Sequence, residues 1–193
     1  MSEARNFEDD LRNSNNPKLR EDWVRIFKLR FGEDIEIIWK DDKETQKGFG
    51  TDITIKTNKG RRYSIELKGR KNSCIGKDYI MEIKNHVYDK EDKENRTCLN
   101  SYDGWIYTTT AEYIFHATLD QKGESIIECI CYSLIPFKTP LWKSEFEKYE
   151  TFFLPTRFYD GRFQWTINKL IPKEVIKKDA LEFWEWKKEN GNN

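Results

Sequence analysis

The segment from Gly48 to Lys71 constrains the fold more than any other part of the chain. On either side of a central turn, apolar and polar residues alternate one by one, which is the period expected of half-buried β-strands. The turn at 57–60 (TNKG) combines an asparagine, which tolerates a left-handed backbone, with a glycine, which allows positive φ. The pattern therefore predicts an antiparallel hairpin with one apolar face and one polar face.

The polar face of this hairpin carries two carboxylates and an amine. Glu66 and Lys68 are two residues apart and so share a face, and Asp52 joins them if the register places the two polar faces together. Bringing two carboxylates and an amine together on one face is energetically costly, and binding of a divalent metal would explain it. Mg²⁺ binds through a few carboxylates and keeps several of its waters. We therefore expect a Mg²⁺ site here, with Mn²⁺ as a substitute, beside an amine that can act on a phosphodiester.

Asp52, a spacer of thirteen residues and then Glu66-Leu67-Lys68 resemble the metal-binding signature of the PD-(D/E)xK nuclease superfamily. Threonine precedes the acid where that signature has proline, a position at which the superfamily is lax. By this resemblance, Asp52 and Glu66 would ligate the metal and Leu67 would add its backbone carbonyl. Lys68 would orient the attacking water or stabilise the charge that develops on the phosphorus centre.

The resemblance also implies a fold: a mixed central β-sheet flanked by helices, α/β or α+β in class and restriction-endonuclease-like. It follows the expected order of elements over residues 19–120, whereas specific residues match only within 48–71. In the superfamily, the opening helix often carries another acid. Here a helical pattern runs from Pro17 to about Phe31, and Glu21 on it is the candidate accessory catalytic acid. An ordinary first-turn acid, favoured by the helix dipole, is the alternative role for Glu21.

The Glu-x-Lys triplet is weak by itself, because three others occur, at 82–84, 91–93 and 185–187. Only Glu66 has a strand-like pattern, a preceding hairpin turn and an acid at the end of the previous strand. A solvated hairpin face with one ordinary cross-strand ion pair is the plainer alternative.

The 193 residues fit one domain, with a core over about 17–135 and a C-terminal helix and hairpin extension over 136–193. Aromatic residues make up 15% of the chain and compensate for its low hydrophobic content, because each buries a large area. Periodicity predicts helices at 3–12, 141–149 and 173–188, strands at 33–39, 105–108, 111–117 and 125–135, a strand or short helix at 78–88, and a hairpin at 152–165 around Asp160-Gly161.

Several classes of protein are disfavoured by composition. No apolar run reaches the length of a membrane span, so neither a transmembrane helix nor a membrane partner is expected. The charged N-terminus argues against a secretory signal, and we expect a cytoplasmic protein. The four cysteines match no zinc-binding spacing and no iron–sulfur cluster is expected; Cys129 and Cys131 should be buried thiols on one side of a strand.

The net charge is zero, which counts against a general nucleic-acid binder. A local basic patch nevertheless follows the motif directly, at 68–71 (KGRK). Arg70 and Lys71 are therefore candidates for DNA-binding contacts to phosphates that flank the scissile bond. Solubility is the alternative reason for such a patch.

These features predict a Mg²⁺-dependent deoxyribonuclease, an endonuclease that hydrolyses phosphodiester bonds of duplex or branched DNA in a resolvase-, repair- or restriction-like role. The chain lacks helicase and ATPase motifs, which favours a stand-alone enzyme of the kind that phages and mobile elements carry. A homodimer would supply two related sites for two strands. A catalytically inactive nucleic-acid-binding or assembly module on the same fold is the alternative, although such modules usually lose an acid or the lysine. An RNA-directed nuclease ranks below both, because no RNA-binding module accompanies the hairpin.

Overall fold

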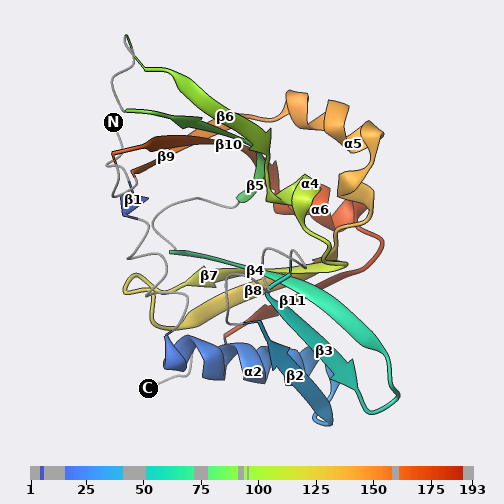
Figure 1. The fold of residues 1–193 in the computed structure, drawn as a ribbon. Helices are drawn as coiled ribbons and strands as arrows, with labels where there is room; N and C mark the ends of the chain where they lie inside the picture. Colours follow the sequence, from blue (N-terminus) through green and yellow to red (C-terminus); the bar gives the residue numbers. More distant parts are fainter. Residues whose placement is uncertain are drawn as a thin grey trace.

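Two β-sheets and the helices packed on them make up the structure (Figure 1), a computed structural model. One sheet has six strands, in the order β11-β8-β7-β4-β3-β2, and the other has five, in the order β1-β9-β10-β5-β6. The expected mixed sheet flanked by helices is confirmed, and a second sheet lies opposite it. The residues that the structure describes are 5–6, 16–40, 51–71, 78–90, 94, 96–157 and 161–188.

The six-stranded sheet contains the predicted hairpin. All of its neighbouring strands pair antiparallel except β4 and β7, which run parallel and make the sheet mixed. Its strands are β2 (Ile35–Trp39), β3 (Ile53–Thr57), β4 (Arg62–Lys71), β7 (Tyr113–Leu119), β8 (Ile126–Ser133) and β11 (Phe183–Lys187).

The hairpin of β3 and β4 has the predicted faces. Ile53 pairs with Ile65 and Ile55 pairs with Tyr63, and the turn between the strands places Gly60 at a φ of 80°. The three isoleucine side chains are fully buried in the core on one side of the sheet. Because side chains alternate along a strand, the polar residues of the hairpin lie on the opposite face.

Helix α2 (Pro17–Phe31) covers the apolar face of this sheet (Figure 1). The Asn16 side chain caps its start by accepting a hydrogen bond from a backbone N–H at 3.0 Å, and Gly32, at a φ of 98°, ends it. The Phe27 ring meets the Phe115 ring of β7 edge to face, with centroids 5.2 Å apart. The buried residues of the helix are Leu19, Trp23, Ile26 and Phe27.

The five-stranded sheet joins segments from both halves of the chain. Its hairpin of β9 and β10 turns near Gly161, which has a φ of 82°, as the Asp-Gly pair predicts. Its strands are β1 (Arg5–Asn6), β5 (Asp78–Tyr88), β6 (Cys98–Asp103), β9 (Thr151–Arg157) and β10 (Phe163–Pro172).

A second core fills the space between the two sheets and the helices at one end of them (Figure 1). The six-stranded sheet contributes Ile114, Ile130 and Tyr132, and the five-stranded sheet contributes Met81 and Ile171. The connecting helices that close this core are α4 (Trp105–Thr108), η1 (Pro136–Lys138), α5 (Pro140–Glu145), η2 (Phe146–Lys148) and α6 (Lys173–Asp179).

Two expected elements differ from the structure. The segment 105–108 is the short helix α4 and not a strand, because Trp105 and Ile106 are consecutive in sequence and both buried. The segment 173–188 is not one helix: α6 ends at Asp179 and strand β11 follows. In a strand Trp184 and Trp186 share a face, which packs against the core beneath α2.

Two further expectations concern the ends of the chain. Arg5 and Asn6 form β1, paired with β9, and the rest of the helix expected at 3–12 lies outside the described residues. The expected division between a core and an extension at residue 135 does not follow the sheets, since β8 pairs with β11 and β5 pairs with β10 across it. The thiols of Cys129 and Cys131 are buried, as predicted.

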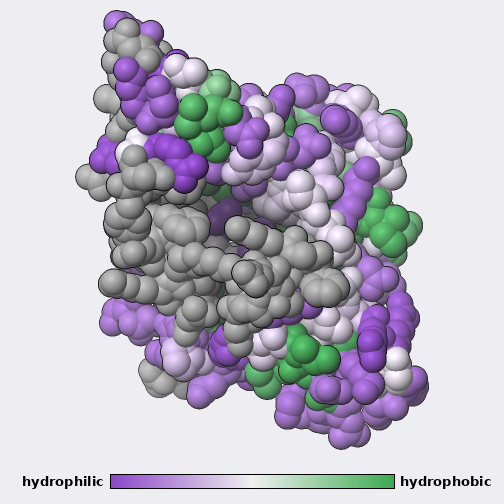
Figure 2. Space-filling view, in the orientation of Figure 1, coloured by the Kyte–Doolittle hydropathy of each residue, from purple (hydrophilic) through white to green (hydrophobic). Residues whose placement is uncertain are grey.

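The surface agrees with a chain in which 35% of the residues are charged. Among the residues drawn in colour in Figure 2, hydrophilic ones predominate and hydrophobic ones form separate patches. Within the described residues, no helix is both long and apolar enough to cross a membrane.

Gly104 provides a test of how tightly α4 is packed. A Cβ at this position would lie 2.2 Å from the Glu82 carbonyl oxygen, a backbone atom of β5 that cannot move aside alone. We expect Gly104→Ala to lower the free energy of unfolding by about 3 kcal/mol, measured by urea denaturation. The matched control is Gly69→Ala, whose Cβ would meet only the Leu119 side chain at 3.4 Å. Equal losses in the two variants would contradict the close packing.

Candidate metal-binding and active site

The site forms where β4 extends beyond the start of β3. Strand β3 begins at Ile53, opposite Ile65, whereas β4 continues to Lys71. Asp52 therefore lies just before the strand, and its backbone N–H donates to the Ile65 carbonyl at 3.0 Å while its carbonyl accepts from the Lys40 N–H at 3.0 Å. These two hydrogen bonds hold the backbone of Asp52 beside the part of β4 that extends past β3.

The Asp52 side chain forms a hydrogen bond to β4 at a position where β3 no longer pairs with it. Its Oδ2 accepts a hydrogen bond from the Leu67 N–H at 2.7 Å. The N–H and C=O of a strand residue point to the same side, as they do in a hydrogen-bonded antiparallel pair. The Leu67 carbonyl therefore projects toward the edge of β4 where the Asp52 carboxylate lies.

Glu66 lies on the polar face of β4 and is buried. Its Oε1 accepts a hydrogen bond from the Lys68 Nζ at 2.6 Å, and its Oε2 accepts one from the Thr109 hydroxyl at 3.3 Å. Burial raises the pKa of the Glu66 carboxyl above its usual 4.5; the Lys68 ammonium lowers it, and the negative charge of Asp52 raises it. The charge of Asp52 therefore reaches the Glu66 carboxyl.

Lys68 completes the predicted group. Burial by itself would lower the pKa of Lys68, but the negative charges of Glu66, Asp52 and Glu82 and the hydrogen bond to Glu66 raise it above 10.5. Lys68 is therefore an ammonium at neutral pH. It also lies 5.1 Å from the centroid of the Trp105 ring, a cation–π contact.

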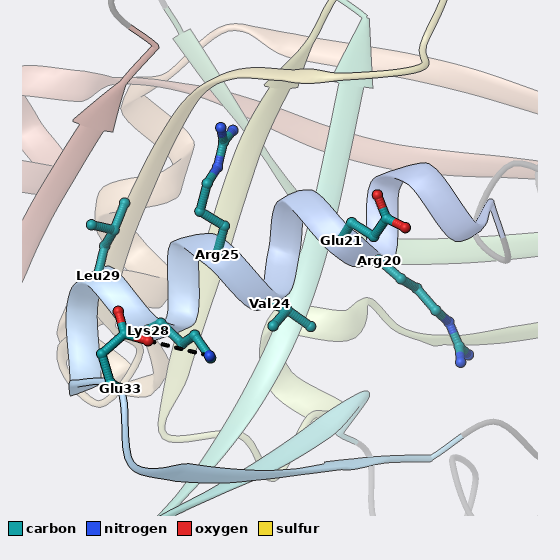
Figure 3. Close-up of a pocket in the computed structure, with 7 residues that line it drawn as sticks. All are labelled: Arg20, Glu21, Val24, Arg25, Lys28, Leu29 and Glu33. Carbon is teal, nitrogen blue, oxygen red and sulfur yellow. Dashed lines mark ion pairs between the residues drawn. The ribbon is translucent and has the colours of Figure 1, made fainter.

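The structure places the Asp52 carboxylate against the Leu67 backbone and Lys68 against Glu66, but it places Glu21 elsewhere. Glu21 is exposed on the outer side of α2, the helix that covers the apolar face of the sheet, whereas Glu66 and Lys68 project from the other face. Figure 3 shows Glu21 lining a shallow pocket on that helix. The expectation that Glu21 points toward the metal site is corrected, because the sheet itself lies between them. The other residues lining that pocket are Arg20, Val24, Arg25, Lys28, Leu29 and Glu33.

Arg70 and Lys71 continue β4 directly beyond the motif. Arg70 has the same parity along the strand as Glu66 and Lys68, and its charge acts on His116 of the neighbouring strand β7. Arg70 is therefore on the face that carries the site. The backbone of Lys71 pairs with Leu119, and its side chain lies outside the described residues.

His116 lies opposite Lys68 in the parallel register of β4 and β7. It is buried; its Nδ1 shares a hydrogen bond with the Tyr132 hydroxyl at 3.2 Å, and the Tyr79 ring stacks on it with centroids 5.3 Å apart. Burial, together with the positive charges of Arg70 and Lys68, holds the pKa of His116 well below 6.5. The imidazole of His116 is therefore neutral at pH 7.

Four residues of the site were not among those predicted: Glu82, Trp105, Thr109 and Lys138. Trp105 donates its backbone N–H to the Glu82 Oε1 at 3.3 Å, and Lys138 donates to the Thr109 carbonyl at 2.7 Å. These residues come from β5, α4, the turn after α4 and η1, and no periodicity relates them to the hairpin. The run of threonines at 108–110 is the one local signal for Thr109.

The donor atoms suit a hard cation. Two carboxylates and a backbone carbonyl belong to neighbouring residues at this end of β4, and Mg²⁺ is commonly held by one or two carboxylates with water and substrate phosphates as its other ligands. Among the described residues there is no group of three or more His, Cys, Asp or Glu side chains arranged to hold a metal. Asp52, Glu66 and the Leu67 carbonyl would therefore hold an ion that also needs solvent or substrate oxygens.

Comparisons with known proteins do not place the chain in a family. No protein-family model, no curated protein and no solved structure matches it. What can be inferred about the activity rests on the residues and their geometry.

The buried His116 predicts acid sensitivity of the fold. Below pH 6.5 the unfolded chain protonates this histidine while the folded chain keeps it neutral, so the unfolded state binds more protons and the free energy of unfolding decreases as the pH falls. The loss approaches about 1.4 kcal/mol per pH unit. His116→Gln should show a smaller loss between pH 7 and pH 5 in urea denaturation. The pKa of His86, the chain's other and more accessible histidine, is lowered less, so His86→Gln should stay closer to the parent profile than His116→Gln does. Equal slopes for the parent and His116→Gln would contradict this.

Proposed function

We propose that this protein is a Mg²⁺-dependent deoxyribonuclease, an endonuclease that hydrolyses phosphodiester bonds. One observation carries the proposal: the Asp52 carboxylate binds the Leu67 N–H of β4, next to the ion pair of Glu66 and Lys68, and its charge acts on both of them. Two carboxylates for a cation and an ammonium for a phosphate are the groups that phosphodiester hydrolysis needs. The same residues carry the resemblance to the PD-(D/E)xK nucleases.

Within this proposal Asp52 and Glu66 hold the ion, with the Leu67 carbonyl as a backbone ligand. A bound Mg²⁺ neutralises charge on the scissile phosphate and lowers the pKa of a bound water. Mn²⁺, another hard cation, is expected to substitute. The chain's own contribution is to place the two carboxylates before the ion arrives, which the hydrogen bond from the Leu67 N–H does for Asp52.

Lys68 has capacity for a second partner. An ammonium has three N–H donors and no acceptor, and the bond to Glu66 at 2.6 Å uses one of them. The remaining donors can orient the attacking water or bind a phosphate oxygen as its negative charge grows. The raised pKa of Lys68 keeps it cationic, which suits it to charge stabilisation.

Arg70 and Lys71 are proposed to bind the phosphates next to the scissile bond. Arg70 lies on the face of β4 that carries the site, two residues beyond Lys68, and Lys71 ends the strand with the opposite parity. Contacts from these residues would bind the DNA backbone without reading its sequence. Duplex or branched DNA is the proposed partner. A homodimer would place a second site on the opposite strand, and the proposed location is cytoplasmic.

The test is cleavage with charge-neutral variants. Plasmid, linear duplex, a four-way junction, single-stranded DNA and RNA are each incubated with Mg²⁺, Mn²⁺ or EDTA. Asp52→Asn keeps an oxygen for the Leu67 N–H, and Glu66→Gln keeps acceptors for its partners, so both remove charge with little change in shape. We expect each to reduce the metal-dependent rate at least about 100-fold, because a metal stabilises the transition state by several kcal/mol.

The matched control for this experiment is Glu36→Gln. Glu36 is an exposed acid on β2 that forms an ion pair with Lys56 at 3.2 Å, so its loss should leave cleavage unchanged. Circular dichroism and thermal unfolding would show that all variants are folded. Cleavage by Asp52→Asn or Glu66→Gln at the parent rate would contradict the proposal. Binding of DNA without cleavage in every metal would instead support the inactive binding module.

A further inference from the structure

Glu66 is supported from behind by the turn that joins α4 to β7. The Thr109 hydroxyl in this turn donates to the Glu66 Oε2 at 3.3 Å and accepts a hydrogen bond from the Ala111 N–H at 3.1 Å. A hydroxyl carries a single hydrogen and turns to suit its partners. With an N–H directed at its oxygen, its hydrogen is directed at the carboxylate.

Lys138 holds this turn from the other half of the chain. Its Nζ donates to the Thr109 carbonyl at 2.7 Å and to the Ala111 carbonyl at 2.9 Å, so one ammonium joins the residues on both sides of the turn. Burial lowers the pKa of Lys138, while the negative charge of Glu66 opposes that change, which shows that the ammonium lies within the field of the carboxylate. Residue 138 belongs to η1, so the segment beyond the six-stranded sheet's β8 reaches the site.

The two oxygens of Glu66 are thus fixed by different parts of the structure. Lys68 of the same strand holds Oε1, and Thr109 holds Oε2. A carboxylate that binds a metal is usually itself held by hydrogen bonds from residues that do not touch the ion, and these partners raise metal affinity by setting its orientation. Thr109 and Lys138 stand in that relation to Glu66.

We propose that Thr109 and Lys138 are positioning residues of the metal site: the Thr109 hydroxyl orients the Glu66 carboxylate for the cation, and Lys138 holds Thr109 in place. This inference rests on the proposed function, since it assigns these residues a role toward the same ion. It predicts that metal affinity depends on residues 43 and 72 positions away from Glu66 in the sequence, of which only one touches it.

The first experiment measures metal affinity without turnover. Binding of Mn²⁺ is followed by electron paramagnetic resonance and binding of Mg²⁺ by calorimetry, in the absence of DNA. Thr109→Val keeps the shape of the side chain and removes the hydroxyl, and it should weaken binding about tenfold. Thr109→Ser restores the hydroxyl and should bind within about twofold of the parent.

The neighbouring threonine is the matched control. Thr108 is exposed, and its hydroxyl donates to the Gly104 carbonyl at 3.3 Å, within α4. Thr108→Val should therefore bind both metals as the parent does. Thermal unfolding identifies any variant that has lost its fold, and for such a variant the Thr109→Ser comparison decides the question.

The second experiment tests the route through Lys138. Lys138→Met should weaken metal binding by about three- to tenfold, whereas Lys143→Met, which removes an exposed lysine over the Tyr107 ring, should not. Because Lys138 acts through Thr109, the double variant Thr109→Val/Lys138→Met should be about as weak as Thr109→Val alone. If the losses of metal affinity in the two single variants add up in the double variant, Lys138 does not act through Thr109.

The outcomes separate this inference from the proposed function. If the parent binds neither Mg²⁺ nor Mn²⁺, the proposed function fails and this inference fails with it. If the parent binds metal and the Asp52→Asn variant does not, while Thr109→Val binds as tightly as the parent, only the positioning role is overturned. Loss of affinity in Thr109→Val with recovery in Thr109→Ser establishes that role.

Discussion

The offset between β3 and β4 is the constraint on which the site depends. Pairing of the two strands stops at Ile53 and Ile65, and beyond that point β4 presents backbone groups that no β3 residue meets. A buried N–H without a partner is costly, so the Asp52 carboxylate takes the bond from Leu67 that a strand would have taken. The geometry that satisfies the backbone thereby places a carboxylate beside the next acid along the sheet.

The ion pair of Glu66 and Lys68 is a poor source of stability. Both groups are largely removed from water, and the cost of desolvating them offsets much of their attraction. Removing either partner alone would leave the other charge buried without its partner. Such a pair is therefore better explained by the chemistry proposed for the site than by folding, and the hydrophobic burial beneath α2 is what holds the sheet together.

Segments outside the hairpin bury Glu66. Gly104 lies so close to β5 that a side chain there would overlap the Glu82 backbone, and this contact sets Trp105 beside Lys68. Lys138 then ties the following turn to η1. Part of the surroundings of Glu66 thus comes from segments that have no local relation to the hairpin, which is why Glu66 is more buried than a residue on an ordinary solvated hairpin face.

The local patterns alone were sufficient to predict the hairpin, its two faces and helix α2, because alternation and turn chemistry act between near neighbours in sequence. They also placed Glu66 and Lys68 on one face, but the position of Asp52 depended on a register that the pattern left open. Tertiary packing decided the rest. Helix α2 covers the face of the sheet opposite to Glu66 and Lys68. Glu21 on that helix therefore cannot reach the site, because the sheet lies between them. The segments 105–108 and 183–187 took the conformations that buried their aromatic residues. Thr109 and Lys138 meet Glu66 only through long-range pairing of strands and helices, a relation that no periodicity in the chain encodes.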